Sequence, residues 1–325
     1  MINVGIVGGT GYTAGELIRL LINHPKAKID FVYSTSRAGD SITAVHQDLL
    51  GETDLIFSSE INRDIDVLFL CTGHGNSTKV LNNSPVSQKT KIIDLSNDFR
   101  LKGDNKFDAR TFVYGLPELQ RSEIIKADNI ANPGCFATAI QLALLPLANV
   151  SALKNDVHIH GITGSTGAGS SLRETTHFTW RDNNVSIYKA LDHQHIGEIK
   201  QSIKQLSSSF DSKLNFIPVR GNFARGIFVS AYTQTDLSLD NAQSLYTEFY
   251  EDAPFVHIST EPLYLKQIVN TNKCLLHLQK KDEQLLVSSI IDNLLKGASG
   301  QALQNMNLMF GWDETTGLKL KPTHF

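Results

Sequence analysis

The chain has 325 residues, 41% of them hydrophobic, and carries 30 Lys plus Arg against 33 Asp plus Glu. This length favours two domains with hydrophobic cores, and the near balance of charge argues against nucleic-acid partners or attachment to an anionic membrane. No apolar run is long enough to span a bilayer, and the opening "INVGIVGG" lacks a signal-peptide pattern, so we expect a cytoplasmic protein.

The first 37 residues predict a strand, a glycine-rich turn, a helix and a second strand. Inside the turn, Gly9, Gly11 and Ala14 match the dinucleotide-binding fingerprint in the form that accepts alanine at its third position. Such a turn lets the backbone approach a pyrophosphate, which the N–H groups at the start of the helix can bind. The alternative is a turn that only packs. The predicted cofactor-binding residues are Gly8, Gly9, Thr10, Gly11, Tyr12 and Thr13.

The end of the second predicted strand indicates which dinucleotide is bound. An acidic residue there would favour NAD, but the chain reads "STSRAG", with Ser34, Ser36 and Arg37 and no carboxylate. Hydroxyls and a guanidinium suit the 2′-phosphate of NADP. Arg37 as a solvated surface charge is the alternative.

Two further strands are predicted in "DVLFLCTGHG" and "TKIIDLS", with a helix between them, as a doubly wound sheet requires. Gly73, His74 and Ser77 follow the first of these strands, where open α/β sheets place ligands. We expect them to line the cofactor site. His74 could equally be an ordinary loop histidine.

A cysteine stands at the predicted start of a helix in "NIANPGCFAT". Apolar residues recur at helical spacing after Cys135, with Asn132 as a candidate cap and Pro133 suited to the start of a helix. The helix dipole and the first-turn N–H groups favour a thiolate there, so Cys135 is predicted to be a nucleophile rather than a buried apolar residue. The widely spaced Cys71 and Cys274 lie in apolar strands and are expected to pack, without a disulfide framework or a zinc site.

The segment "ALDHQHIGEIKQSIKQL" offers a base for this thiol. His193 and His195 precede an amphipathic helix, and Glu198, one turn beyond, could orient an imidazole. Metal ligation is disfavoured because no third ligand stands at metal spacing. The histidines could instead cap or pack the helix, and the pattern does not decide which histidine is the base.

Taken together, the motifs resemble the N-acetyl-γ-glutamyl-phosphate reductase family over nearly the whole chain. The marks are "GGTGYTAGEL", "IIDLSNDFRL", "YGLPEL", "NPGCFAT", "GSTGAG", "HQHIGEI" and "DNLLKGASGQALQNMNLMFGWDETTGL". The resemblance implies NADPH-dependent reduction of an N-acyl-γ-glutamyl phosphate through a Cys135 thioester, a step of arginine biosynthesis. It also implies an α/β fold related to aspartate-semialdehyde dehydrogenase, with a Rossmann-type domain and an α+β mixed-sheet domain like the C-terminal domain of glyceraldehyde-3-phosphate dehydrogenase.

The same resemblance implies the domain limits and the remaining site residues. An NADP-binding domain would span residues 1–134 and be completed by a C-terminal helix within 300–325, and residues 135–299 would form the catalytic domain that assembles a homodimer or homotetramer. Further cofactor contacts would come from Ser165, Gly167, Ala168 and Gly169, and Asn293, Lys296 and Gly297 fall where the family contacts the cofactor. Independently of the resemblance, Arg100 and Arg173 are candidates for binding the phosphate because a guanidinium suits it, although either could equally form a structural surface pair. Asn132 is a further candidate for binding substrate or phosphate.

The chain departs from the family pattern at Ala14, where the family commonly has glycine, and in one loop. Where a histidine is expected in "FIPVRGNFARGIF", the chain has Arg220 and Asn222, although Arg225 and Gly226 are retained. The departure indicates a different acyl group on the substrate amine, so an N-succinyl substrate is an alternative to N-acetyl. The sequence is also compatible with a carrier-protein-linked aminoadipyl-phosphate reductase, with aspartate-semialdehyde dehydrogenase, and with a non-catalytic NADP-binding redox sensor.

Overall fold

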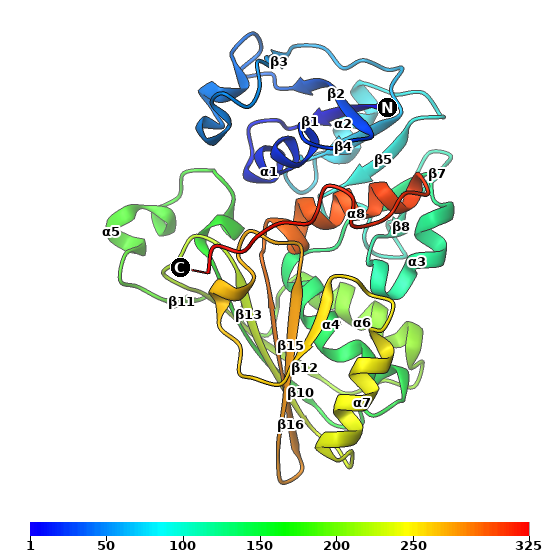
Figure 1. The fold of residues 1–325 in the computed structure, drawn as a ribbon, viewed down its shortest axis with the longest axis vertical. Coiled ribbons are helices and arrows are strands. Elements are labelled where there is room, and N and C mark those ends of the chain that lie inside the picture. The colour runs from blue at the N-terminus through cyan, green and yellow to red at the C-terminus, as the bar shows by residue number, and fades with distance from the viewer. Residues whose placement is uncertain (325) are drawn as a thin grey trace. The chain divides into compact units, whose positions relative to one another are not determined.

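The computed structural model describes residues 1–324, which form two compact units (Figure 1). The first comprises residues 1–133 and 298–319, and the second comprises residues 134–297 and 320–324. None of the helices formed by the described residues is long and apolar enough to cross a bilayer.

The first unit is built on a seven-stranded sheet in the order β3-β2-β1-β4-β5-β9-β8, in which every neighbouring pair is parallel. Its central strands are buried on both faces, as parallel sheets covered by helices require. The strands are β1 (Ile2–Val7), β2 (Ala27–Tyr33), β3 (Phe57–Ser58), β4 (Val67–Leu70), β5 (Lys91–Asp94), β8 (Val113–Tyr114) and β9 (Asn129–Ala131). The helices are α1 (Tyr12–Leu21), α2 (Ser77–Asn83), α3 (Pro117–Lys126) and α8 (Gly300–Met309), and β6 (Lys106–Phe107) pairs with β7 (Arg110–Thr111) outside the sheet.

The second unit is built on a mixed seven-stranded sheet in the order β11-β12-β10-β13-β16-β15-β14. Its strands are β10 (Val157–Thr163), β11 (Ser186–Ile187), β12 (Leu214–Arg220), β13 (Ile227–Gln234), β14 (Val256–Ser259), β15 (Cys274–Lys281) and β16 (Gln284–Ile291). Its helices are α4 (Cys135–Asn149), α5 (Phe178–Arg181), α6 (His195–Leu206) and α7 (Leu239–Phe249). The predicted α/β class, with one doubly wound parallel sheet and one mixed sheet, is confirmed.

Helix α4 is almost fully buried in the second unit, where it packs on β13, β15 and β16 of the sheet and contacts α6 and α7. Pro146 lies inside this helix without ending it, because the helix continues to Asn149. A proline at this position leaves the carbonyl of Leu142, four residues earlier, without its helical N–H donor. The Tyr250 hydroxyl donates to that carbonyl at 2.6 Å and so replaces the missing hydrogen bond.

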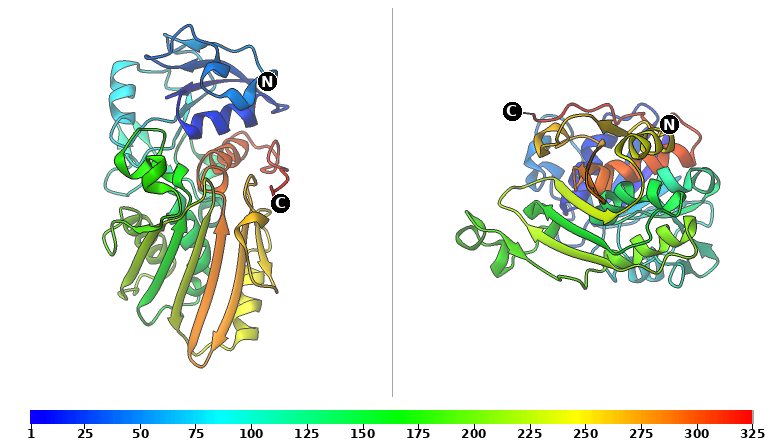
Figure 2. Two further views of the ribbon diagram at one scale, coloured as in Figure 1. Left: turned by 90° about the vertical axis from the view of Figure 1, so that its left-hand side faces the viewer. Right: turned by 90° about the horizontal axis from the view of Figure 1, so that it is seen from below.

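The opposite face of the mixed sheet is bare of helices (Figure 2). Side chains on β10 and β13 alternate between buried and exposed, as expected for a sheet with one covered face. The bare face includes Ile217 and Tyr232, which are 37% and 44% exposed, and the ring of His158 stacks on Tyr232 at 5.1 Å between centroids. We call this surface the open sheet face.

Candidate active site

Cys135 is the first residue of α4, and Gly134 is the N-cap. No side chain caps this helix, so its first-turn N–H groups, at the end that carries the thiol, receive no hydrogen bond from a capping side chain. Cys135 itself is partly exposed. The capping role predicted for Asn132 is wrong. Its amide donates to Ala298 O at 3.0 Å and its carbonyl accepts from Asn305 Nδ2 at 3.1 Å, because it is committed to the packing of the first unit.

His195 and Glu198, both on the first turn of α6, lie against the residue that precedes the cysteine. A Cβ atom on Gly134 would stand only 2.3 Å from His195 Nε2, so the imidazole occupies the space that a side chain would fill. Glu198 Oε2 accepts from Gly134 N at 2.9 Å, and its Oε1 lies 3.9 Å from His195 Nε2. Both side chains are buried, so the carboxylate fixes the backbone at the thiol and faces the imidazole at once.

His193 lies behind His195 in an aromatic cluster. Its ring meets those of Phe136, Phe216 and Tyr188 edge-on, and lies 4.6 Å from the His195 ring. Burial, reinforced by Lys189, lowers the pKa of His193 to about 4. His193 Nδ1 accepts from His195 N at 3.2 Å, so its neutral ring orients the start of α6.

A π-helical turn, Leu295–Ser299, follows β16 and reaches the cysteine. A Cβ atom on Gly297 would lie 2.8 Å from Cys135 Cβ, so the two backbones are in close contact. Asp292, fully buried, accepts from the N–H groups of Leu294 and Leu295 and forms a two-bond pair with Arg225. The start of this turn is therefore fixed by a buried carboxylate.

Asn293, predicted to contact the cofactor, links two loops by hydrogen bonds. Its Oδ1 accepts from Gly226 N at 2.7 Å and its Nδ2 donates to Thr166 Oγ1 at 3.0 Å. Thr166 belongs to the "GSTGAG" loop, which forms the short 3-10 turn Ser165–Ala168 and ends at Gly169 with φ of 78°. Ser165, Gly167 and Ala168 are all on this turn, so Asn293 shapes the loop that carries the other predicted contacts.

In the first unit, the glycine-rich turn has the shape that a pyrophosphate requires. Gly8 has φ of +84°, and a Cβ atom there would lie 2.6 Å from Cys71 O. A Cβ atom on Gly9 would lie 2.4 Å from Val32 Cγ1, whereas Gly11 meets nothing nearer than 3.8 Å. Helix α1 has Gly11 as its N-cap and no capping side chain, so its N-terminal end is suited to an anion.

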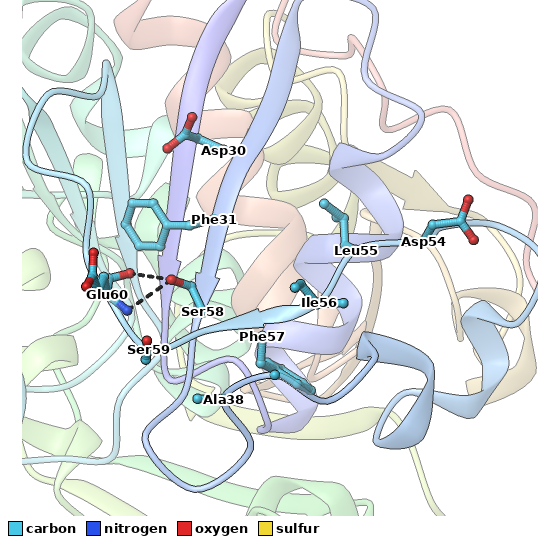
Figure 3. Close-up of a pocket in the computed structure, with 11 residues that line it drawn as sticks. Asp30, Phe31, Ala38, Asp54, Leu55, Ile56, Phe57, Ser58, Ser59 and Glu60 are labelled. Carbon is cyan, nitrogen blue, oxygen red and sulfur yellow. Dashed lines mark hydrogen bonds between the residues drawn. The ribbon is translucent and has the colours of Figure 1, made fainter.

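Ser34, Ser36 and Arg37 follow β2 at the end of the sheet that carries this turn. Ser34 is buried, while Ser36 and Arg37 are exposed, and Arg37 forms an ion pair with Asp40 at 3.3 Å. A cavity of about 730 Å³ opens beside the same loop and is lined by Ala38, Gly39 and the residues of β3 (Figure 3). Asp30, Asp54 and Glu60 also line it, so the cavity itself is unsuited to a phosphate.

The loop after β4 is held by a carboxylate. Asp98 accepts from the N–H groups of Gly75 and Ser77, and His74 Nδ1 accepts from Asn97 N at 3.2 Å. Gly73 has open space, with the nearest atom 3.5 Å from a hypothetical Cβ. Ser77 is fully buried and donates to Asp94 at 2.6 Å, so the expectation that it lines the cofactor site is wrong.

The predicted phosphate ligands occupy different settings. Arg100 is buried and donates to Asn132 O at 2.8 Å and to Leu95 O at 3.0 Å, so it supports the backbone before the cysteine. Arg173 is exposed on a short turn.

The two other cysteines are buried, and burial raises the pKa of Cys71 to about 12, which is incompatible with a reactive thiolate.

Comparison with known proteins identifies the family. Residues 3–127 match the protein-family model described as the NAD binding domain of semialdehyde dehydrogenase, and residues 135–293 match its dimerisation domain. N-acetyl-gamma-glutamyl-phosphate reductases from Christiangramia forsetii and Flavobacterium johnsoniae are each 59% identical to the chain over 325 residues, 100% of both sequences. The chain belongs to the N-acetyl-gamma-glutamyl-phosphate reductase family. The resemblance found in the sequence motifs is thus confirmed.

Solved structures show that this reductase family shares its fold with a related enzyme. Aspartate semialdehyde dehydrogenase II from Vibrio cholerae is similar with a TM-score of 0.75 at 16% identity, covering 96% of this chain and 99% of that one. The aspartate semialdehyde dehydrogenase with NADP from Candida albicans gives 0.70 at 12% identity, covering 95% and 98%. At these identities the likeness concerns the fold alone.

Sequence reasoning missed several residues that shape this reductase's site. His46 Nε2 is hydrogen-bonded to Gly9 O at 2.7 Å, and Ser299 donates to Thr13 O at 2.7 Å, so both hold the glycine-rich turn from distant parts of the chain. Tyr188, packed on His193, and the buried Arg181 were also missed. No local pattern marks these residues, because their neighbours come from other elements.

Proposed function

We propose that this protein is a cytoplasmic, NADPH-dependent reductase that converts N-acetyl-γ-glutamyl phosphate to N-acetyl-L-glutamate 5-semialdehyde and phosphate in arginine biosynthesis. The observation that carries the proposal is a thiol at an uncapped helix start, beside a buried imidazole and carboxylate. Full-length relatives that share 59% of their residues bear the name of this activity.

Cys135 is the nucleophile of this proposal. Its sulfur attacks the γ-acyl carbon, the bond from that carbon to the phosphate oxygen breaks, and phosphate leaves with the electron pair, so a thioester remains. The first-turn N–H groups of α4 stabilise the negative charge that develops on the acyl oxygen. When bound, NADPH supplies the hydride that reduces the thioester to the aldehyde level.

His195 is the acid–base residue in this scheme. Its ring edge fills the space beside Gly134, directly before the thiol, and Glu198 faces its Nε2 atom. It takes the thiol proton at the start and protonates or deprotonates the acyl oxygen as the carbon–sulfur bond forms and breaks. His193, neutral because its pKa is about 4, positions His195 through the backbone.

The first unit holds the cofactor in this proposal, and the second carries out the chemistry and the self-association. The turn from Gly8 to Thr13 would bind the pyrophosphate, and Ser34, Ser36 and Arg37 would bind the 2′-phosphate that distinguishes NADP from NAD. Their hydroxyls and guanidinium, without a carboxylate at the strand end, support NADP.

We further propose that a second copy of the chain covers the open sheet face to form a homodimer or a homotetramer built from it. The face belongs to the region matched by a dimerisation-domain model, and it exposes Ile217 and Tyr232. Tyr232→Glu should therefore shift the mass measured by light scattering toward the monomer. An unchanged mass would exclude this face as the interface.

The decisive experiment follows NADPH formation in the reverse direction, from N-acetyl-L-glutamate 5-semialdehyde, NADP and phosphate. The parent protein should turn over repeatedly only with phosphate and form no more than one NADPH per active site without it. Cys135→Ser should abolish NADPH formation while Cys274→Ser retains it. Acid-quenched incubation with the aldehyde and NADP without phosphate should leave a mass adduct on Cys135. Absence of turnover by the folded parent would refute the assignment.

A further inference from the structure

Arg181 is a buried cation without a counter-ion among the described residues. The residue, at the end of α5, is only 7% exposed, and its Nη2 donates to Asn184 O at 2.9 Å. Its Nε and Nη1 atoms are buried and have no acceptor among residues 1–324. Its guanidinium lies over the Trp180 ring at 4.9 Å. Two donor nitrogens of a charged group are thus left without an oxygen to accept their hydrogen bonds.

Arg220, at the end of β12 and only partly buried, also has one donor nitrogen without an acceptor. Its Nε is buried without an acceptor in the described chain, and its guanidinium lies 4.7 Å from the centre of the Tyr188 ring. No ion pair links Arg181 or Arg220 to a carboxylate in the part of the chain that the structure describes. Burial lowers the pKa of Arg181, and the positive charge of Arg220 lowers it further, so the two guanidiniums repel each other.

The surrounding backbone holds these two arginines together. Ser186 on β11 pairs with Arg220 on β12, which aligns the two segments. The side-chain amide of Asn222, in the orientation in which its nitrogen and its oxygen both find partners, donates to Arg181 O at 3.2 Å and accepts from Asn183 N at 2.9 Å. Arg220 and Asn222 are also the residues at which the chain departs from the family pattern. The departure therefore builds one local structure around Arg181.

Tyr188 connects this pair to the reaction centre. Its ring, beneath Arg220, lies 5.8 Å from the ring of His193, which in turn contacts His195. Burial raises the pKa of Tyr188 to about 12, with a further contribution from the charge of Cys135 that the charge of Arg220 opposes. Tyr188 therefore lies within electrostatic reach of both the thiol and Arg220, and Arg220 lies within reach of Arg181.

We propose that Arg181 and Arg220 form a carboxylate-binding subsite that selects the substrate by its charge at a distance from the reacting carbon. Holding two guanidiniums close together, one of them buried, is unfavourable unless an anion compensates their charge, and the planar guanidinium is suited to two parallel bonds with a carboxylate. The substrate carries an α-carboxylate, and an N-acyl group ending in an acid would carry another. This inference rests on the proposed function and deepens it by assigning the substrate-recognition residues.

Steady-state kinetics with chosen aldehydes tests the subsite. The parent, Arg220→Gln, Arg181→Gln and the exposed control Arg63→Gln would be assayed with three substrates: N-acetyl-glutamate 5-semialdehyde, its N-succinyl counterpart, and 4-acetamidobutanal, which lacks the α-carboxylate. Loss of a charge-assisted hydrogen-bond pair should raise the aldehyde KM about 10- to 100-fold in the two subsite variants, with a smaller change in kcat and none in the control.

The substrate series identifies which carboxylate is bound. If it is the α-carboxylate, the parent discriminates against 4-acetamidobutanal and the variants lose that discrimination. If it is the acid of the acyl group, the parent prefers the N-succinyl aldehyde and the variants lose this preference. Arg220→Lys should recover part of the binding, because it restores the charge without the two-bond geometry.

Two results would overturn the subsite. A rise in the phosphate KM with an unchanged aldehyde KM would reassign the pair to phosphate. Unchanged constants in folded variants would remove any role in substrate binding. Both are distinct from failure of the proposed function, in which the parent itself would turn over none of the aldehydes.

Discussion

Replacing Gly297 with alanine should displace the nucleophile while leaving the fold intact. The new methyl carbon would lie 2.8 Å from Cys135 Cβ and 3.3 Å from Cys135 Cα and from Asp292 O. These atoms belong to backbone or are attached directly to it, so they cannot rotate away. Carbon atoms pack best at about 3.5–4.0 Å, so the two segments must separate by roughly 0.7 Å or more.

The Gly297→Ala substitution changes the free energy of unfolding in two ways of opposite sign. Overpacking costs about 1–3 kcal/mol, whereas alanine is favoured over glycine in a helix by about 1 kcal/mol, so the free energy of unfolding should fall by no more than about 2 kcal/mol. The reaction is far more sensitive to position, since a displacement of about 1 Å can reduce the rate about 100-fold. We therefore expect kcat to fall roughly 10- to 100-fold in a protein that remains folded.

Three measurements on Gly297→Ala separate these effects: kcat for phosphate-dependent NADPH formation, the rate of Cys135 alkylation by iodoacetamide, and unfolding in urea. Gly103→Ala is the matched control, because a Cβ atom on Gly103 would meet nothing within 4 Å. Both kcat and the alkylation rate should change in the first variant alone. A kcat within twofold of the parent, with an unchanged alkylation rate, would refute the close contact as a determinant of the thiol's position.

Three further predictions concern charge. His193→Gln should weaken the pH dependence of the free energy of unfolding between pH 6.5 and 4. The pKa of His193 is about 4 in the folded protein and near 6.5 in the unfolded chain, so the unfolded chain binds an extra proton as the pH falls through this range. The parent's free energy of unfolding in urea should drop there by up to about 1.4 kcal/mol per pH unit from this group, and less steeply in the variant. Asp292→Asn should destabilise the protein by about 2–4 kcal/mol in urea because it leaves Arg225 without its buried carboxylate, whereas exposed Asp236→Asn should change little; equal effects would contradict this reasoning. Arg37→Gln should raise the KM for NADPH about 10-fold and leave that for NADH unchanged, and a parallel rise in both would place Arg37 outside the 2′-phosphate site.

The fold class and the glycine-rich turn could be predicted because each depends on a local pattern. The strand, turn and helix of the first residues need only alternating apolar residues and glycines at fixed offsets, and the structure places β1 and α1 where that pattern indicates. The capping role of Asn132 failed for the opposite reason. Its partners, Ala298 and Asn305, are 166 and 173 positions away, and no local pattern contains them.

The helix that carries the nucleophile shows the same limit. Proline inside a helix removes a backbone donor and commonly bends or ends the helix, but α4 continues past Pro146 because Tyr250 supplies a hydroxyl to the Leu142 carbonyl. The replacement hydrogen bond requires α7 to pack on α4, which is a property of the folded unit as a whole. Sequence rules describe the isolated helix correctly, and tertiary packing changes the outcome.

The two glycines beside the nucleophile have a common physical role that only the structure reveals. Gly134 has φ of −71°, and Gly297 is not among the residues with positive φ, so neither is required by an unusual backbone conformation. Each is required by space: Gly134 admits the imidazole of His195, and Gly297 admits the π-helical turn to the Cys135 backbone. A side chain at either position would separate the thiol from one of the groups that fix it. The absence of two Cβ atoms therefore positions the thiol as directly as the carboxylate of Glu198 does.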